Sequence, residues 1–294
     1  MNKNYLLAIA SYEDSRQEFF EKYTSKRNKE YSLIHGLEYI EVTEGVKPIR
    51  GKLGWYKTFK VNEILDDIND GDTLTYLDAD MAIVDKSKLF IPEKDKSFSY
   101  SIDSGNTHCM GSFSIRVNDW SRNLMKLVID EGRYQNLINV TTIHEHKGSE
   151  SSFWEEFYDQ ASWYSLAGIK RHSDKSFWKI PNFGWHSSRD EWTIYSLEEL
   201  YNNVQIFPTN YNVTELPGES TCAYYINKVN YNKVFIRHFA GGQEWRSEWF
   251  LPKNIKFHLI HLNPFNYLIA YRNLYLPRIK NTIKKILKFT NLRK

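Results

Sequence analysis

Cysteine is scarce in this sequence. Only Cys109 and Cys222 occur among its 294 residues. Two cysteines exclude a disulfide framework and a four-cysteine metal site. So low a cysteine content is typical of a reducing compartment, and we expect the protein to be cytoplasmic.

The amino-terminal part lacks a long apolar run. Its first apolar segment, residues 5–10, is too short for the core of a signal peptide or for a membrane span, and it is better interpreted as a first β-strand. The sequence also contains no internal repeat and no low-complexity linker. Its length suits one large α/β domain or two small ones.

Acidic residues are missing from the carboxyl end. No Asp or Glu follows Glu248, whereas ten Lys or Arg residues do. The overall charge of +3 therefore combines a charge of −7 over residues 1–248 with a wholly basic end. This asymmetry predicts two parts, an α/β domain over residues 1–248 and a basic helical extension over residues 249–294.

The basic end has the spacing of an amphipathic helix. Ile279, Ile283, Ile286 and Leu287 recur on one side, and lysines lie between them. Such a helix favours an anionic membrane surface, so we expect peripheral association with the inner face of the membrane. Nucleic acid is not expected as a partner, because stacking aromatics and a nucleic-acid fold signature are missing. A helix docked on the body is the open alternative.

Helical and strand patterns alternate along the body. A βαβα order at the start predicts an α/β fold with a parallel sheet and right-handed crossovers. Asn118 or Asp119 is expected to cap one of the later helices. Residues 170–233 are rich in loop signals and are not assigned. The expected strands are 5–10, 37–42, 73–77, 98–102, 110–117 and 234–239, and the expected helices are 14–35, 53–68, 119–131 and 155–168.

Two carboxylates follow the apolar strand that ends at Leu77. Asp78 and Asp80 are one residue apart, at the end of a strand where open α/β sheets bind ligands. Their oxygens are suitable ligands for Mn²⁺ or Mg²⁺, which can neutralise the diphosphate of a nucleotide sugar. A plain acidic turn is the alternative interpretation.

A second candidate ligand lies far downstream. His238 ends the strand 234–239, and a neutral imidazole is a good third ligand for Mn²⁺. Gly241 and Gly242 follow it and would let the backbone approach a diphosphate closely. A core or turn histidine followed by a simple turn is the alternative.

Two further positions suggest contacts with a donor. Asp159 and Gln160 lie on or beside the helix 155–168 in apolar surroundings, where a carboxylate and an amide could stabilise positive charge at an anomeric carbon. Lys57, at the start of the helix 53–68, could meet a phosphate group. A helix-surface pair and a solvated lysine are the alternatives.

Six groups of residues follow one another along the chain: Arg27 to Tyr31 with His35-Gly36, Trp55-x-Lys57, Leu77 to Asp80, Gly111 to Arg116 with Trp120-Ser121, Asp159-Gln160 and His238 to Gly241. In this order they resemble glycosyltransferase family 34, the retaining galactosyl-, xylosyl- and mannosyltransferases with a GT-A fold. Glycosyltransferase family 8 is the nearest competitor, and Asn28, Tyr31, His35-Gly36 and Trp120-Ser121 favour family 34. The similarity spans about residues 5–245.

The resemblance implies a GT-A (Rossmann-like) fold with a mixed, mostly parallel sheet flanked by helices. It implies a retaining glycosyltransferase that moves a hexose or pentose from a nucleotide sugar, with UDP favoured, to a glycan or lipid-linked acceptor. It implies active-site roles for Asp159 and Gln160. It also implies that Asp78, Asp80 and His238 bind Mn²⁺ or Mg²⁺. The nucleotide would lie against Ala10, Ser11 and Tyr12.

Two departures from the family pattern leave other functions open. Cys109-Met110-Gly111 stands where the family commonly has Asn-x-Gly, and Gln243 stands where a lysine often follows the His-x-x-Gly motif. A non-catalytic carbohydrate- or nucleotide-binding protein on the same scaffold is therefore one alternative. A nucleotide-sugar hydrolase is another.

Overall fold

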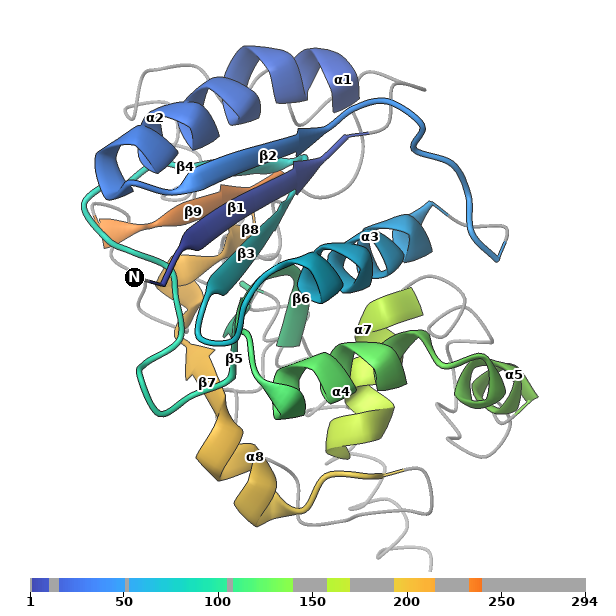
Figure 1. The fold of residues 1–294 in the computed structure, drawn as a ribbon. Coiled ribbons are helices and arrows are strands. Elements are labelled where there is room, and N and C mark those ends of the chain that lie inside the picture. Colours follow the sequence, from blue (N-terminus) through green and yellow to red (C-terminus); the bar gives the residue numbers. More distant parts are fainter. Residues whose placement is uncertain are drawn as a thin grey trace, which may run out of the picture.

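A computed structural model describes seven stretches of the chain: residues 2–10, 16–50, 53–104, 108–139, 158–169, 193–214 and 233–239. Within them, helices lie on both sides of a central β-sheet (Figure 1). A smaller sheet lies beside it. The helices are α1 (Arg16–Phe19), α2 (Lys26–His35), α3 (Gly54–Asp67), α4 (Asp119–Ile129), α5 (Glu131–Asn139), α7 (Tyr158–Ala167) and α8 (Leu197–Asn203).

The central sheet has six strands in the order β2-β1-β3-β6-β5-β7. β6 runs antiparallel to both of its neighbours, and the other five strands share one direction. The mixed, mostly parallel sheet flanked by helices that the family resemblance implied is therefore confirmed. The strands are β1 (Asn4–Ile9), β2 (Glu38–Val42), β3 (Thr73–Asp78), β5 (Phe98–Ile102), β6 (His108–Arg116) and β7 (Val204–Phe207).

The second sheet joins three short strands in the order β4-β9-β8. These are β4 (Met81–Ile83), β9 (Ile236–His238) and β8 (Val213–Thr214). β4 and β9 are antiparallel, with Met81 opposite His238. This pairing brings the residues that follow β3 next to a strand from the late part of the chain.

Alternating side chains of β1 pack into different layers. Tyr5, Leu7 and Ile9 belong to the larger core cluster, which α3, α4 and α7 cover. Leu6 belongs to a second cluster with Tyr31 of α2. Because both faces of the strand are buried, its sequence is an almost continuous apolar run.

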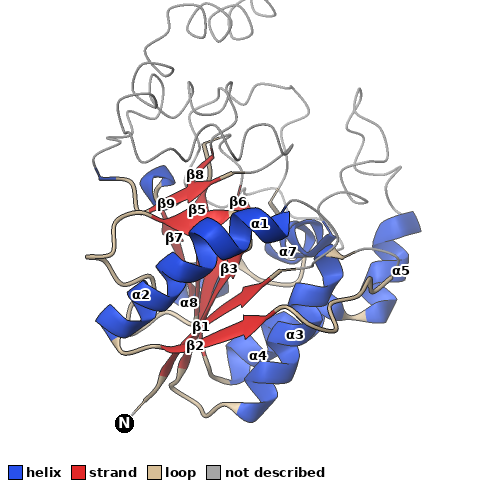
Figure 2. Ribbon diagram, turned by 90° about the horizontal axis from the view of Figure 1, so that it is seen from above, coloured by secondary structure: helices blue, strands red, loops and turns tan. Residues whose placement is uncertain are grey.

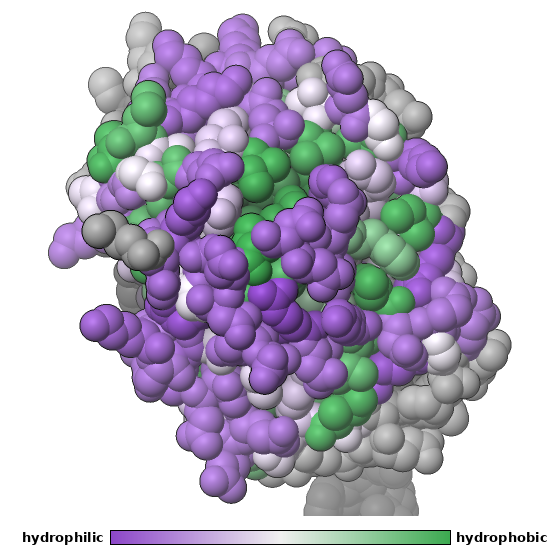
Figure 3. Space-filling model, viewed as in Figure 1, coloured by the Kyte–Doolittle hydropathy of each residue, from purple (hydrophilic) through white to green (hydrophobic). Residues whose placement is uncertain are grey.

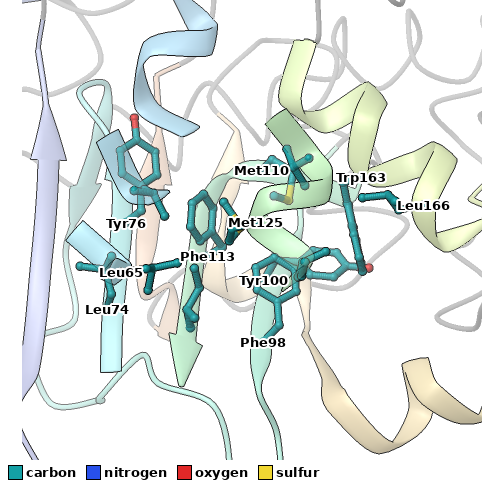
Figure 4. Packing of buried hydrophobic residues seen from close by; sticks show 14 of the residues in the cluster. Leu65, Leu74, Tyr76, Phe98, Tyr100, Met110, Phe113, Met125, Trp163 and Leu166 are labelled. Carbon is teal, nitrogen blue, oxygen red and sulfur yellow. The ribbon is translucent and has the colours of Figure 1, made fainter. Parts of the chain in front are cut away.

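Figure 4 shows part of the larger cluster, with Tyr76 and Phe113 side by side and Trp163 against the rings from β5. Figure 2 shows α3 and α4 on the other side of the sheet from α2.

Some elements differ from the sequence prediction. The helix expected over residues 14–35 contains a π-helical segment at Phe20–Ser25. Residues 170–233, left unassigned, supply both α8 and β7, and β7 forms one edge of the central sheet. The helix α5 was not predicted either.

The surface is mostly hydrophilic on the face seen in Figure 3, with separate apolar patches. Among the described residues, none of the helices has both the length and the apolar character that a membrane span requires. The basic extension over residues 249–294 lies outside the described residues, and both its helix and the domain boundary at residue 248 stay predictions.

Candidate active site

Asp78 is the last residue of β3, at the edge of the central sheet where the parallel strands have their carboxyl ends. Its Oδ1 atom accepts a hydrogen bond of 2.6 Å from the hydroxyl of Tyr76 and lies 3.5 Å from Nζ of Lys57. Burial and the neighbouring Asp78 carboxylate raise the pKa of Tyr76 well above its usual value. The phenol therefore remains a hydrogen-bond donor to Asp78 at neutral pH.

Lys57 lies in the first turn of α3, and its ammonium group lies close to three oxygen atoms of the protein. Nζ lies 3.2 Å from Oδ2 of Asp159, 3.1 Å from the carbonyl oxygen of Met110 and 3.5 Å from Asp78. Burial opposes the charge on Lys57, but the carboxylates of Asp159 and Asp78 outweigh it and raise the pKa of Lys57. The described contacts of the ammonium group are thus with the protein, and its predicted phosphate contact stays a prediction.

Asp159 and Gln160 lie in the first turn of α7, and both are buried. Burial raises the pKa of Asp159 to about 6, against the lowering effect of Lys57. Oε1 of Gln160 accepts a hydrogen bond of 3.1 Å from the backbone N–H of Met110. The structure therefore brings these two residues next to Lys57 and Asp78, although their predicted catalytic roles remain untested.

A bulge in β6 gives Met110 its unusual partners. The register with β5 passes from Tyr100 opposite Phe113 to Ser101 opposite Cys109, so residues 110–112 have no partner in β5. Bulges release backbone groups from the ladder and are frequent beside active sites. Here the released N–H and C=O of Met110 bind Gln160 and Lys57.

Gly111, within the bulge, leaves the space that Asp78 occupies. A Cβ atom on Gly111 would lie 2.6 Å from Oδ2 of Asp78 and 2.5 Å from Cε of Met81. Real Cβ atoms do not approach other atoms so closely. The missing side chain is therefore required by the position of the carboxylate.

Asp80 and His238 lie together. Nε2 of His238 is 3.6 Å from Oδ1 of Asp80, and the backbone N–H of Phe239 donates to the carbonyl oxygen of Asp80 at 2.9 Å. The β4–β9 pairing fixes this arrangement by placing Met81 opposite His238. Nδ1 of His238 is buried, and it has no hydrogen-bond partner among the described residues.

A carboxylate oxygen and an imidazole at this separation fit Mn²⁺ or Mg²⁺, because both atoms can point at one ion. Within the described residues, no group of three His, Cys, Asp or Glu side chains is arranged to hold a metal ion. Asp78 instead contacts Tyr76 and Lys57. Asp80 and His238 thus lie close enough to share an ion, and metal binding by these two residues and by Asp78 stays a prediction.

The predicted nucleotide contacts are only partly described. Ala10 is buried at the end of β1, in a small cluster with Phe20, and Ala79 of the Asp78-Ala79-Asp80 turn packs against that cluster. Ser11, Tyr12, Gly241 and Gly242 lie outside the described residues. Ala10 therefore lies beside the acidic turn, and its contact with a nucleotide stays a prediction.

Tyr76 and the backbone of Met110 were not predicted as parts of the site. Tyr76 had a usable signal, because residues two apart in a strand point to the same face, and Tyr76 stands two before Asp78. The role of the Met110 backbone depends on the bulge in β6, which the apolar pattern of the strand does not reveal.

No protein-family model and no curated protein matches this chain. Its fold is similar to that of several solved glycosyltransferase structures. One is a glycosyltransferase involved in the glycosylation of the major capsid of PBCV-1, with 15% identity, a TM-score of 0.48 and coverage of 83% of this chain and 97% of that one. Another is GlyE of Streptococcus pneumoniae TIGR4, with 13% identity, a TM-score of 0.43 and coverage of 88% and 61%.

A third is the galactosyltransferase LgtC, solved with donor and acceptor sugar analogues, with 11% identity, a TM-score of 0.43 and coverage of 88% of this chain and 95% of that one. These likenesses concern the arrangement of helices and strands. The function is argued below from the residues of this chain.

Proposed function

We propose that this chain is a metal-dependent, retaining glycosyltransferase that uses a nucleotide sugar as donor. The observation that carries the proposal is the meeting of Asp80 and His238, 3.6 Å apart at the junction of the two sheets. The buried group of Lys57, Asp159 and Asp78 adjoins the same acidic turn. A cation-binding pair beside a buried, charged cluster is suited to a donor that carries both a diphosphate and a sugar.

We assign two of these residues to the diphosphate of the donor and two to its sugar. Asp80 and His238 would hold a divalent cation, which when bound supplies neutralising charge for the departing diphosphate. Asp159 would face the sugar, where its carboxylate stabilises positive charge at the anomeric carbon. Gln160 would present its amide N–H groups, since its oxygen accepts from Met110.

In the proposed reaction the acceptor hydroxyl attacks the anomeric carbon from the face that the diphosphate leaves. The carbon–oxygen bond to the diphosphate breaks, the bond to the acceptor oxygen forms, and a diphosphate oxygen takes the hydroxyl proton. The configuration of the sugar is thereby retained. Family 34 membership, a UDP-linked hexose or pentose and a glycan or lipid-linked acceptor belong to this proposal through the resemblance stated above.

The test is a panel of UDP- and GDP-sugars incubated with the protein and Mn²⁺, with and without glycan acceptors. We expect release of nucleoside diphosphate that an acceptor accelerates and EDTA abolishes. Asp80→Ala should lower turnover by about a hundredfold or more, because it removes one of two protein ligands of the cation. Mn²⁺ binding by electron paramagnetic resonance checks the same variant without turnover.

Asp95→Ala is the matched control, since the Asp95 side chain is 73% exposed and pairs only with its neighbour Lys96 among the ion pairs of the described residues. It should keep wild-type turnover and metal affinity. Binding of a sugar nucleotide without release of nucleoside diphosphate would instead identify a non-catalytic binding protein. Release that no acceptor accelerates would identify a hydrolase.

A further inference from the structure

Lys57 is enclosed by groups from three different elements. Its ammonium group donates hydrogen bonds to Asp78 of β3 and to the Met110 carbonyl oxygen of β6, and it forms an ion pair with Oδ2 of Asp159 of α7 that is not aligned as a hydrogen bond. The side chain is 13% exposed. A phosphate group that contacts this ammonium would compete with two buried carboxylates for its charge, and weakening either ion pair would leave a buried carboxylate with less compensation.

The backbone of Met110 connects this group of residues to β6. Its carbonyl oxygen accepts from Lys57, and its N–H donates to Gln160, the neighbour of Asp159. The bulge frees both groups from pairing with β5. The beginning of α7 and the beginning of α3 are therefore attached to the backbone of one residue of β6, through the two successive peptide units that flank its Cα atom.

We propose that Lys57 is a positioning residue, whose ammonium group holds the carboxylates of Asp159 and Asp78 in place against the bulged strand β6. The importance of this position for transfer rests on the function proposed above, in which Asp159 faces the sugar. The attachment itself is a property of the folded chain. It can be tested without a donor.

Several ionisable groups influence Asp159. Lys57 on α3 is the cation beside it, Asp78 on β3 repels it, and the phenol of Tyr76 is neutral because its pKa is raised. On β6, burial raises the pKa of the Cys109 thiol, which is therefore also neutral. Removing the charge of Lys57 would leave Asp159 with burial and the repulsion of Asp78, so its pKa would rise further above about 6.

Thermal unfolding of Lys57→Met tests the attachment in the absence of substrate. A carboxyl group whose pKa is raised in the folded state lowers stability as the pH increases from its unfolded pKa through its folded pKa, and the loss is complete above the latter. Lys57→Met should therefore lower Tm more at about pH 8 than at about pH 5. Adding Asp159→Asn should recover much of the loss at pH 8, because it removes the unpaired buried charge.

The control is Lys60→Met, one turn further along α3, where the lysine pairs with the exposed Glu63. Its Tm should change little, and equally at both pH values. An equal loss of Tm at pH 5 and pH 8 for Lys57→Met, with no recovery by Asp159→Asn, would overturn the proposed attachment whether or not the protein transfers a sugar.

The kinetics of transfer then separate positioning from phosphate binding. For Lys57→Met we expect kcat at neutral pH to fall about tenfold or more, KM for the donor to change less than about threefold, and the acidic limb of the pH profile to move to higher pH. Lys57→Arg, which keeps the charge, should restore the position of that limb.

Binding of UDP in the presence of Mn²⁺ gives the opposing outcome. If Lys57 binds phosphate, its replacement by Met should weaken UDP binding about tenfold or more and leave the acidic limb unmoved. That pair of results would overturn the positioning role. Absence of transfer by the wild-type protein, with the pH-dependent loss of Tm intact, would instead contradict only the proposed function.

Discussion

Gly111 illustrates how a single residue without a side chain decides the position of a functional one. The carboxylate of Asp78 occupies the space beside its Cα atom, held there by Tyr76 and Lys57. Met81 also fills this space, but its terminal methyl group can move at little cost. The carboxylate has less freedom, because two donors direct it.

We expect Gly111→Ala to reduce transfer about tenfold or more while lowering Tm by only a few degrees, because Asp78 must turn away from its two donors. Turnover and thermal unfolding measured on the same preparation check this. Gly132→Ala on α5 is the control, since its Cβ would come no closer than 3.3 Å to Oδ1 of Asp130. Full activity of Gly111→Ala would show that Asp78 does not need its present position.

At this scale the sequence indicated which residues belong to the candidate site but not which of them contact one another. Asp78 and Asp80 were predicted from their place after an apolar strand, and the structure puts them at the end of β3 and in the turn after it. The sequence does not reveal that Asp78 contacts Lys57 whereas Asp80 contacts His238. Side-chain direction at the end of a strand depends on neighbours from distant segments, and local pattern carries no record of them.

The local sequence predicts some of the elements around the site better than others. Helix α4 has a capping box, in which Asn118 accepts from the N–H of Ser121 at 2.9 Å and the hydroxyl of Ser121 accepts from the N–H of Asn118 at 3.0 Å. The helix end was predictable, because such caps depend on residues three apart. The bulge in β6 has no comparable local signature.

We predict that Asn118→Ala destabilises the protein by about 1 kcal/mol or more, which corresponds to a decrease in Tm of about 2–4 °C or more, because the variant loses this cap and the hydrogen bond of 2.9 Å that Nδ2 of Asn118 donates to Ser97. Turnover at 25 °C should be unchanged, because α4 supports the core and contributes no side chain to the proposed site. Chemical denaturation and a transfer assay measure the two effects. Asn118→Asp, which keeps the accepting oxygen, should lose less stability, and an equal loss would argue against capping as the cause.

Two elements were missed, one of them in spite of a local signal: α8 begins with a capping box formed by Ser196 and Glu199. Helix α8 and strand β7 lie in a segment that the sequence left unassigned, although β7 pairs with β5 over four residues. A strand of this length is below the size at which periodicity is informative, and tertiary pairing stabilises it.

For the whole molecule, charge asymmetry leads to a prediction about the basic end. Removing residues 277–294 should weaken binding to anionic vesicles about tenfold or more and leave transfer to a soluble acceptor nearly unchanged, because the lysines and isoleucines there form an amphipathic pattern. Vesicle sedimentation with anionic and neutral lipids is the measurement. Unchanged sedimentation of the shortened chain would exclude the proposed membrane contact.

The sequence by itself determined the α/β class, the strands that form the middle of the sheet and the acidic turn after β3, because apolar periodicity and strand-end position are local properties. Only the tertiary structure decided that His238 meets Asp80 and that Lys57 joins Asp159 to Asp78. Those contacts depend on the pairing of β4 with β9 and on the bulge in β6. Both result from packing between segments that are far apart in the chain. The partners of a buried charge or of a free backbone group are therefore determined by the whole fold and not by the neighbouring sequence.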